Sequence, residues 1–155
     1  MPPAGGKAVA MPEVRRARTV AAPVEEVWTL VSDPFHLPRW WPLTARVEDA
    51  TALAWTSVLK TARGTTVRAD YTRTEYEPPR RIAWQQELDE SPFERVFSAA
   101  STTVRLEPEG DAATRVELRA QERLRGRYRL GGWLVRRAAR RRLDEALTGI
   151  AEATE

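Results

Sequence analysis

The sequence predicts an α+β fold in which a curved antiparallel sheet wraps around a long C-terminal helix. Segments with alternating apolar and polar residues, typical of half-buried strands, occupy the middle of the chain from about residue 43 to 125. A short apolar stripe with helical spacing precedes them, after one further strand at residues 13–21. From about residue 130 to 153 the apolar spacing becomes that of a long helix.

The early helical region begins directly after the first strand. Pro23 suits the first position of a helix, since its ring pre-sets φ and its missing N–H would have no partner there. Glu25 and Glu26 follow in the first turn, where carboxylates complement the helix dipole. An apolar stripe that should face the interior comes next: Val24, Val27, Trp28 and Val31. Asp33-Pro34 ends this helix, and a second short helical segment follows at residues 35–42.

Six more strands are predicted, over residues 43–48, 53–60, 67–75, 82–88, 93–106 and 114–125. The strand at 93–106 has an irregular middle of small residues from Ser98 to Ser101, which leaves room for a ligand or a bulge. The last strand alternates most regularly, with Val116, Leu118, Ala120 and Leu124 on one face. Leu143, Leu147 and Ile150 then form the stripe by which the terminal helix should pack on the sheet.

Three stretches of sequence resemble one known superfamily in the same order. AAPVEEVWTLVSDPFHLPRWWP, YEPPRRIAW and RLEPEGDAATRVEL are similar to segments of the START-like, or SRPBCC, superfamily, which includes polyketide cyclase/dehydrase-like families. The resemblance covers nearly the whole chain from Glu13. It implies the helix-grip fold, with a ligand-binding domain over residues 13–155 and a cavity between the sheet and the terminal helix. Residues 1–12 are expected to form a flexible tail.

Composition excludes several kinds of chemistry. The chain has no cysteine and only one histidine, His36, so thiolate sites, cysteine nucleophiles and multi-histidine metal sites are excluded. His36 lies in an aromatic segment and is expected to be a surface or packing residue rather than a catalytic base. No GxSxG, phosphate-loop, HExxH or calcium-loop motif occurs, so no metal and no cofactor are expected. Without a signal peptide or a long apolar segment, the expected location is cytoplasmic.

The positive charge is concentrated near the C-terminus. Residues 123–143 contain nine arginines and no acid, although the net charge of the whole chain is only +3. Such a segment can attract phosphate-bearing partners or an anionic membrane surface. We expect a solvated face instead, with no nucleic-acid partner and with peripheral membrane contact as the less favoured alternative. No pattern in the sequence predicts an oligomeric state.

The tryptophans form a second set of candidate residues. Trp40, Trp41, Trp55, Trp84 and Trp133 either belong to an ordinary core or line or gate an apolar pocket, and ligand sites are mostly apolar. The superfamily resemblance favours the pocket, with the Trp40–Trp41 segment at its mouth. The residues expected to line it and to bind the ligand are Trp40, Trp55, Leu59, Tyr71, Trp84, Leu118, Leu143 and Leu147.

Charged residues on apolar faces form the third set. Glu122 lies on the apolar face of the last strand, where it is either an isolated acid/base or the partner of Arg16 or Arg18 on the first strand. Arg73 and Arg140 are expected near one end of the cavity, where an arginine can meet the oxygen or carboxylate of an amphipathic ligand. In the alternative arrangement these arginines pack their stems at the rim and keep their charges in water.

Three functions are consistent with these residues. In the first, the protein binds a small hydrophobic or amphipathic molecule, such as a lipid, polyketide, isoprenoid or aromatic metabolite. In the second, it is a polyketide cyclase/dehydrase-type enzyme in which Glu122 moves a proton. In the third, the arginine-rich segment binds an anionic partner.

Overall fold

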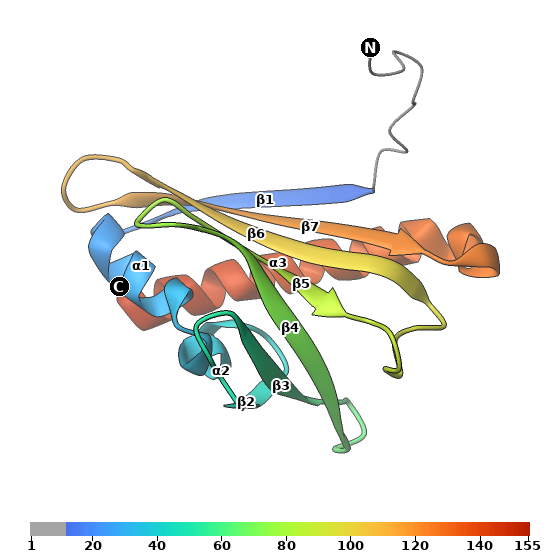
Figure 1. Ribbon diagram of the computed structural model, residues 1–155. Coiled ribbons are helices and arrows are strands. Elements are labelled where there is room, and N and C mark those ends of the chain that lie inside the picture. The colour runs from blue at the N-terminus through green and yellow to red at the C-terminus, as the bar shows by residue number, and fades with distance from the viewer. Residues whose placement is uncertain (1–11) are drawn as a thin grey trace, which may run out of the picture.

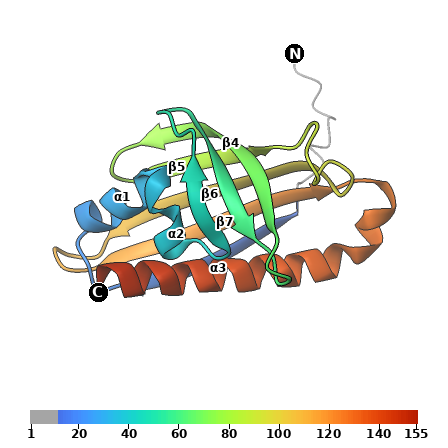
Figure 2. The same ribbon diagram turned by 90° about the horizontal axis from the view of Figure 1, so that it is seen from below.

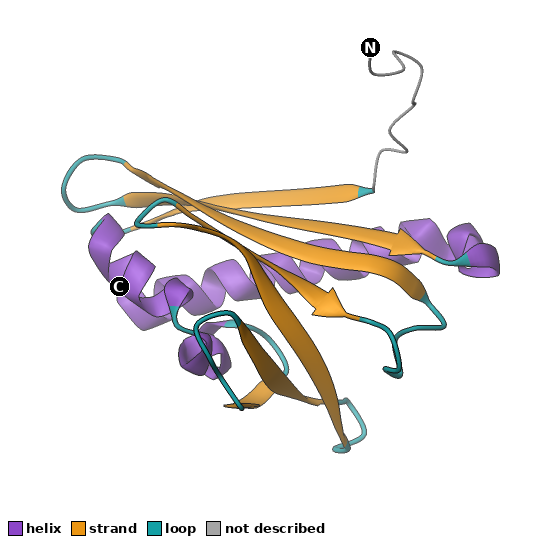
Figure 3. Ribbon diagram, viewed as in Figure 1, coloured by secondary structure: helices purple, strands orange, loops and turns teal. Residues whose placement is uncertain are grey.

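The computed structural model describes residues 12–155 as one seven-stranded antiparallel sheet in the order β1-β7-β6-β5-β4-β3-β2 (Figures 1 and 3). The strands are β1 (Glu13–Val20), β2 (Thr44–Glu48), β3 (Ala54–Lys60), β4 (Thr66–Glu77), β5 (Arg81–Glu87), β6 (Phe97–Pro108) and β7 (Thr114–Leu124). The helices are α1 (Val24–Ser32), α2 (Leu37–Trp40) and α3 (Gly132–Thr154), with short 3₁₀ segments η1 (Pro34–His36) and η2 (Gly126–Gly131). The tail expected over residues 1–12 lies, apart from Pro12, outside the described residues.

All three helices lie on one side of the curved sheet. Figures 1 and 2 show α3 running along this side beneath β1 and β7, with α1 and α2 between its C-terminal half and the rest of the sheet. The arrangement is the helix-grip fold, so the expected α+β class and the seven strands are confirmed. The stripe on α3 is confirmed as well, since Leu143, Leu147 and Ile150 are buried against the sheet.

The α1 stripe is correct except at Trp28. Val24, Val27 and Val31 are buried, and Leu30 is buried with them. Trp28 is only half-buried and lies against Tyr76, with the two ring centroids 5.5 Å apart. Because each helical residue turns by about 100°, Trp28 projects to the flank of the arc centred on Val27, whereas Leu30 stays within that arc.

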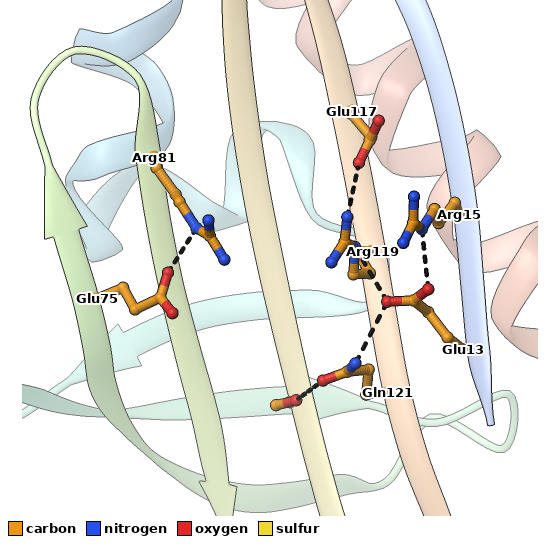
Figure 4. Close-up of polar contacts among 8 residues, drawn as sticks. Glu13, Arg15, Glu75, Arg81, Glu117, Arg119 and Gln121 are labelled. Carbon is orange, nitrogen blue, oxygen red and sulfur yellow. Dashed lines mark hydrogen bonds and ion pairs between the residues drawn. The ribbon is translucent and has the colours of Figure 1, made fainter. Parts of the chain in front are cut away.

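A network of charged side chains covers the outer face of the sheet (Figure 4). Arg119 pairs with Glu13 at 3.1 Å and with Glu117 at 3.3 Å, while Gln121 donates a hydrogen bond to Glu13. Further along, Arg81 pairs with Glu75. Charges on this face therefore neutralise one another in contact with water, and any apolar ligand site must lie on the opposite, helix-covered face.

The region predicted as one strand at residues 93–106 is shorter and bent. β6 begins only at Phe97, after a loop at residues 88–96, and its register shifts between Phe97 and Ala99. The small residues of this segment had suggested a bulge or space for a ligand, and the bulge is present. Leu53, the first residue of the strand predicted at 53–60, precedes β3 and is exposed.

Candidate functional site

A cavity of about 470 Å³ lies between the inner face of the sheet and α3. Its size falls within the range of small-molecule sites. The strands β3 to β7, the segment after α2 and one residue of α3 contribute to its walls. The side chains that line it from the interior include Trp41, Leu59, Tyr71, Trp84, Gln86, Phe93, Phe97, Ala100, Thr102, Glu122 and Arg142.

Aromatic rings form one wall of the cavity. Trp84 lies at their centre and meets Trp41 edge-on, with the ring centroids 5.8 Å apart. Trp40 and Trp55 contact Trp84 from behind, at 6.3 Å and 5.9 Å. Trp55 also stacks on Tyr71 at 5.7 Å and 17°. This second layer holds the lining rings in place, so the wall is largely pre-formed for a flat apolar ligand.

An ion pair introduces charge into this largely apolar site. Arg142 of α3 donates a hydrogen bond of 2.7 Å from Nη2 to Oε1 of Glu122 on β7. The side chain of Glu122 is only 12% exposed, and that of Arg142 is 34% exposed. Glu122 reaches the cavity because it shares the inner face of β7 with Leu118 and Ala120. The two opposite charges neutralise each other where water is scarce.

Among the uncharged polar residues that accompany the ion pair, Tyr71 and Gln86 lie side by side. Tyr71 and Gln86 are cross-strand neighbours on β4 and β5, and both line the cavity. Burial raises the pKa of Tyr71 to about 12, with Arg142 opposing the increase and Glu122 adding to it. The side-chain nitrogen of Gln86 is buried without a hydrogen-bond partner among the described residues. A buried donor of this kind is costly unless a ligand or water accepts from it.

The Tyr71 hydroxyl is expected to remain protonated until the pH reaches about 12. Ultraviolet titration of the folded protein should therefore show one of its three tyrosines ionising well above the other two. The unfolded chain loses this proton near pH 10, so the free energy of unfolding should fall as the pH rises from about 10 to 12. Tyr71→Phe should remove the high transition, and a titration unchanged by that substitution would contradict the assignment.

The structure brings four of the predicted site residues to the cavity. Leu59, Tyr71, Trp84 and Glu122 line it. The other predicted apolar residues are buried in the core and lie outside its lining: Trp40, Trp55, Leu118, Leu143 and Leu147. These positions were correctly assigned to the inner face, but their side chains are covered by neighbouring ones. They can affect a ligand only by supporting the side chains that line the cavity.

The predicted arginines are placed differently. Arg140 is exposed in a surface groove, and Arg73 lies 4.0 Å over the ring of Tyr76. Arg16 and Arg18 are exposed at the edge of the sheet, as in the solvated alternative. Arg16 forms a bidentate ion pair with Asp144 of α3, in which Nε donates to Oδ1 at 2.7 Å and Nη2 donates to Oδ2 at 2.9 Å. The suggested pairing of Glu122 with a β1 arginine is therefore wrong, because Arg142 occupies that position.

Sequence reasoning missed several polar residues of the cavity, among them Arg142 and Gln86. Arg140 precedes Leu147 by seven residues, a spacing that places both on one side of the helix and favours Arg140 as the cavity arginine. Yet the buried arc of α3 also includes Ala139 and Ala146, and Arg142 flanks this arc on the cavity side. Gln86 had a detectable signal, since it continues the inner-face alternation of β5 two residues after Trp84.

Other candidate chemistry is not supported by the described geometry. His36 is half-buried and its Nδ1 lies 3.0 Å from the carbonyl oxygen of Thr29, away from the cavity lining. Within residues 12–155 no three His, Cys, Asp or Glu side chains gather closely enough to hold a metal ion. Over the same residues, no helix is both long and apolar enough to cross a bilayer.

Comparison with known proteins places these features in a family. The model of the family described as polyketide cyclase/dehydrase and lipid transport matches residues 11–155. No curated protein matches the chain. Of the matching structures, a START superfamily protein from Mycobacterium smegmatis has 15% identity and a TM-score of 0.74, with 92% of this chain and 96% of that one covered.

Two further matching structures are aromatase/cyclases. The di-domain ARO/CYC protein BexL from the BE-7585A biosynthetic pathway has 26% identity and a TM-score of 0.77, with 92% of this chain covered. The present chain spans about half, 46%, of its length. The Zhui aromatase/cyclase from Streptomyces sp. R1128 has 21% identity and a TM-score of 0.67, with 92% of this chain and 90% of that one covered.

Proposed function

Because the chain belongs to the polyketide cyclase/dehydrase and lipid transport family, we propose that it binds an amphipathic small molecule in the cavity beneath the sheet. The observation that carries this proposal is the composition of the cavity. A space of about 470 Å³ combines an aromatic wall with a limited number of polar side chains. Such a site removes a ring or chain from water while its few polar groups fix the orientation.

The buried polar groups favour a ligand with uncharged oxygens over a carboxylate, since Lys60, the other cation of the lining, is exposed to water. The charge of Arg142 is already balanced by Glu122 at 2.7 Å, so an acidic ligand would have to displace a carboxylate. A carbonyl or hydroxyl oxygen can instead accept from the unpartnered nitrogen of Gln86. The protonated hydroxyl of Tyr71 offers a second hydrogen-bonding group. This preference revises the expectation, drawn from the sequence, of a carboxylate bound by Arg140.

Native mass spectrometry of the freshly purified protein should show a co-purifying apolar compound. For a defined comparison, 2-naphthol and 2-naphthoic acid have the same ring system and differ in charge at neutral pH. Both should quench tryptophan fluorescence if they reach the cavity, since Trp41 and Trp84 line it. The neutral naphthol should bind more tightly.

A pair of adjacent substitutions tests the location of binding. Thr102 lines the cavity, whereas Thr103 pairs with Ala83 and Arg119 and points to the outer face. Thr102→Phe should weaken naphthol binding by at least roughly tenfold, because an aromatic side chain takes up part of the ligand volume. Thr103→Phe makes the same chemical change and should leave binding intact. Equal affinities in the two variants would place binding elsewhere.

One observation favours a cyclase activity as a second candidate. Glu122 presents a mostly buried carboxylate to the cavity, near the protonated hydroxyl of Tyr71. A carboxylate can take a proton from the carbon beside a carbonyl, and the resulting carbanion can attack a second carbonyl of the same molecule. This attack forms the carbon–carbon bond that closes the ring, and the new alkoxide then takes up a proton, which completes the aldol reaction. Holding both carbonyls close together would supply much of the acceleration.

Heptane-2,6-dione is a small test substrate for this activity. Its intramolecular aldol reaction, followed by loss of water, produces a conjugated cyclic enone that is detected by ultraviolet absorbance. A cyclase should form the enone faster than buffer does, and Glu122→Gln should abolish the excess while retaining 2-naphthol binding. A rate equal to that in buffer, together with tight naphthol binding, would support a carrier alone.

A further inference from the structure

An unusual apolar surface lies where η2 joins α3. Four large apolar side chains are exposed within seven residues: Leu130 at 87%, Trp133 at 57%, Leu134 at 53% and Tyr128 at 37%. We call these four residues the apolar patch. Single exposed apolar residues are common on proteins, whereas several in one short segment mark a surface that meets another apolar phase.

Packing within the fold does not require the apolar patch. The buried residues of α3 begin only at Ala139, more than a turn beyond Leu134. At about 100° per residue, Leu134 projects to the side of α3 opposite Leu143, which faces the core. A polar residue would serve equally well there for folding. The exposed leucines and tryptophan are therefore explained better by an external partner.

Arginines precede, interrupt and follow the apolar patch along the sequence. Residues 125–137 contain five of them, at positions 125, 127, 129, 136 and 137, and no acidic residue. In the described part of the chain none of the five forms an ion pair with a carboxylate. Arg127 lies 5.5 Å over the ring of Tyr128. The segment thus combines uncompensated positive charge with exposed apolar groups.

The apolar patch is joined to the wall of the cavity. Arg125, just before η2, donates a backbone hydrogen bond of 2.8 Å to Val96 and a side-chain hydrogen bond of 3.2 Å to the carbonyl of Phe97. Phe97 itself lines the cavity. Figures 1 and 2 both show η2 and the start of α3 at the end of the molecule that also carries the loop between β5 and β6. A surface that binds the apolar patch therefore lies close to the ligand site.

We propose that the apolar patch and its arginines dock the protein on an anionic membrane surface. Tryptophan and tyrosine favour the interface between headgroups and acyl chains, and leucine inserts just below it. Clustered arginines beside such residues are attracted to anionic lipids. Nucleic acid fits less well, because Leu130 and Leu134 would remain in water. A second copy of the chain would bring the same five positive charges together.

Vesicle flotation of the full-length protein tests the proposal. Binding is expected to vesicles of phosphatidylcholine with phosphatidylglycerol and to be much weaker with phosphatidylcholine alone. Leu130→Ser with Leu134→Ser should reduce binding at least roughly tenfold, since both side chains lose apolar burial. Arg136→Glu with Arg137→Glu should weaken it by more than roughly fivefold per residue, because each substitution replaces attraction by repulsion.

Matched controls use residues of the same type outside the patch. Leu53→Ser alters a leucine whose exposure, 64%, lies between those of Leu130 and Leu134, and Arg63→Glu reverses an exposed charge in the turn between β3 and β4. Both should bind vesicles like the unmodified protein. Affinity for 2-naphthol in vesicle-free solution should be unchanged in all these variants, so this proposal can fail while ligand binding stands.

The proposal is overturned by any of three results. The first is no binding to anionic vesicles even at low salt. The second is vesicle binding that Leu130→Ser with Leu134→Ser leaves intact. The third is an absence of vesicle binding together with a different interaction of the patch, either tight oligonucleotide binding at physiological salt or self-association. The patch variants would have to abolish that interaction. A nucleic-acid or dimer interface would then replace the membrane surface.

Discussion

Gly149→Ala is expected to destabilise the protein by about 1–3 kcal/mol or more, although alanine is the better helix former. Gly149 lies in α3 where that helix crosses α2. A Cβ atom at this position would lie 2.5 Å from the carbonyl oxygen of Trp40 and 2.8 Å from its Cα. Both are backbone atoms, so no side-chain rotation relieves the overlap. The two helices would have to separate, which opens the core around the tryptophans.

Gly132→Ala is the matched control in the same helix. A Cβ atom there meets only the tip of the flexible Arg136 side chain, at 3.4 Å. The usual advantage of alanine should then dominate, so the variant should be unchanged or more stable by up to about 1 kcal/mol. Chemical denaturation of both variants gives the comparison. Equal stabilities would show that α2 and α3 are not in close contact at Gly149.

Gly149→Ala should also impair ligand binding. Trp40 contacts both Trp41 and Trp84, at 5.4 and 6.3 Å, and these two rings line the cavity. Displacement of the Trp40 backbone therefore moves the aromatic wall. Weaker 2-naphthol binding by the folded Gly149→Ala variant, with normal binding by Gly132→Ala, would connect the α2–α3 crossing to the site.

The fold was predictable because its signals are local and repeated. Alternation identified the strands, and the spacing of Leu143, Leu147 and Ile150 identified the terminal helix. Each pattern records which side of an element is buried, and burial of one face is what the sheet and helix require. The resemblance to a known superfamily then supplied the order in which these elements pack.

The cavity was less predictable because it depends on how neighbouring side chains share an inner face. Leu59 and Leu118 both face inward, yet Leu59 borders the open space and Leu118 is completely covered. No pattern along one strand distinguishes these two cases, since the difference is made by residues on other elements. Neighbouring elements also decide the position of Trp133, which the sequence offered as a pocket residue. It is exposed on the apolar patch, because nothing in the described fold covers that turn of α3.

Disrupting the ion pair of the cavity should change both stability and ligand preference. Glu122→Gln leaves Arg142 without its counter-charge in a site where the partly exposed guanidinium is only incompletely hydrated. We expect a loss of about 1–3 kcal/mol in the free energy of unfolding, less than the roughly 3–5 kcal/mol lost when a fully buried pair is broken, because water still reaches Arg142. Arg142→Gln should cost at least as much, because it strands the more deeply buried carboxylate.

The double variant Glu122→Gln with Arg142→Gln measures the coupling energy between the two charges. If the two charges mainly neutralise each other, the double variant should be more stable than the sum of the single losses predicts, with a coupling of about 0.5–3 kcal/mol. Denaturation midpoints of the four proteins provide the double-mutant cycle. Purely additive losses would mean that the 2.7 Å contact contributes little.

Ligand preference gives the sharper test of the same contact. In the unmodified protein Glu122 occupies Arg142, so 2-naphthol should bind more tightly than 2-naphthoic acid. Glu122→Gln frees the guanidinium, whose planar donors suit a carboxylate, and the order of the two affinities should reverse. The double variant has neither charge and should again favour the naphthol. If the acid already binds more tightly to the unmodified protein and Glu122→Gln does not change the ratio, Glu122 does not control access to Arg142, and the preference for uncharged oxygens is wrong.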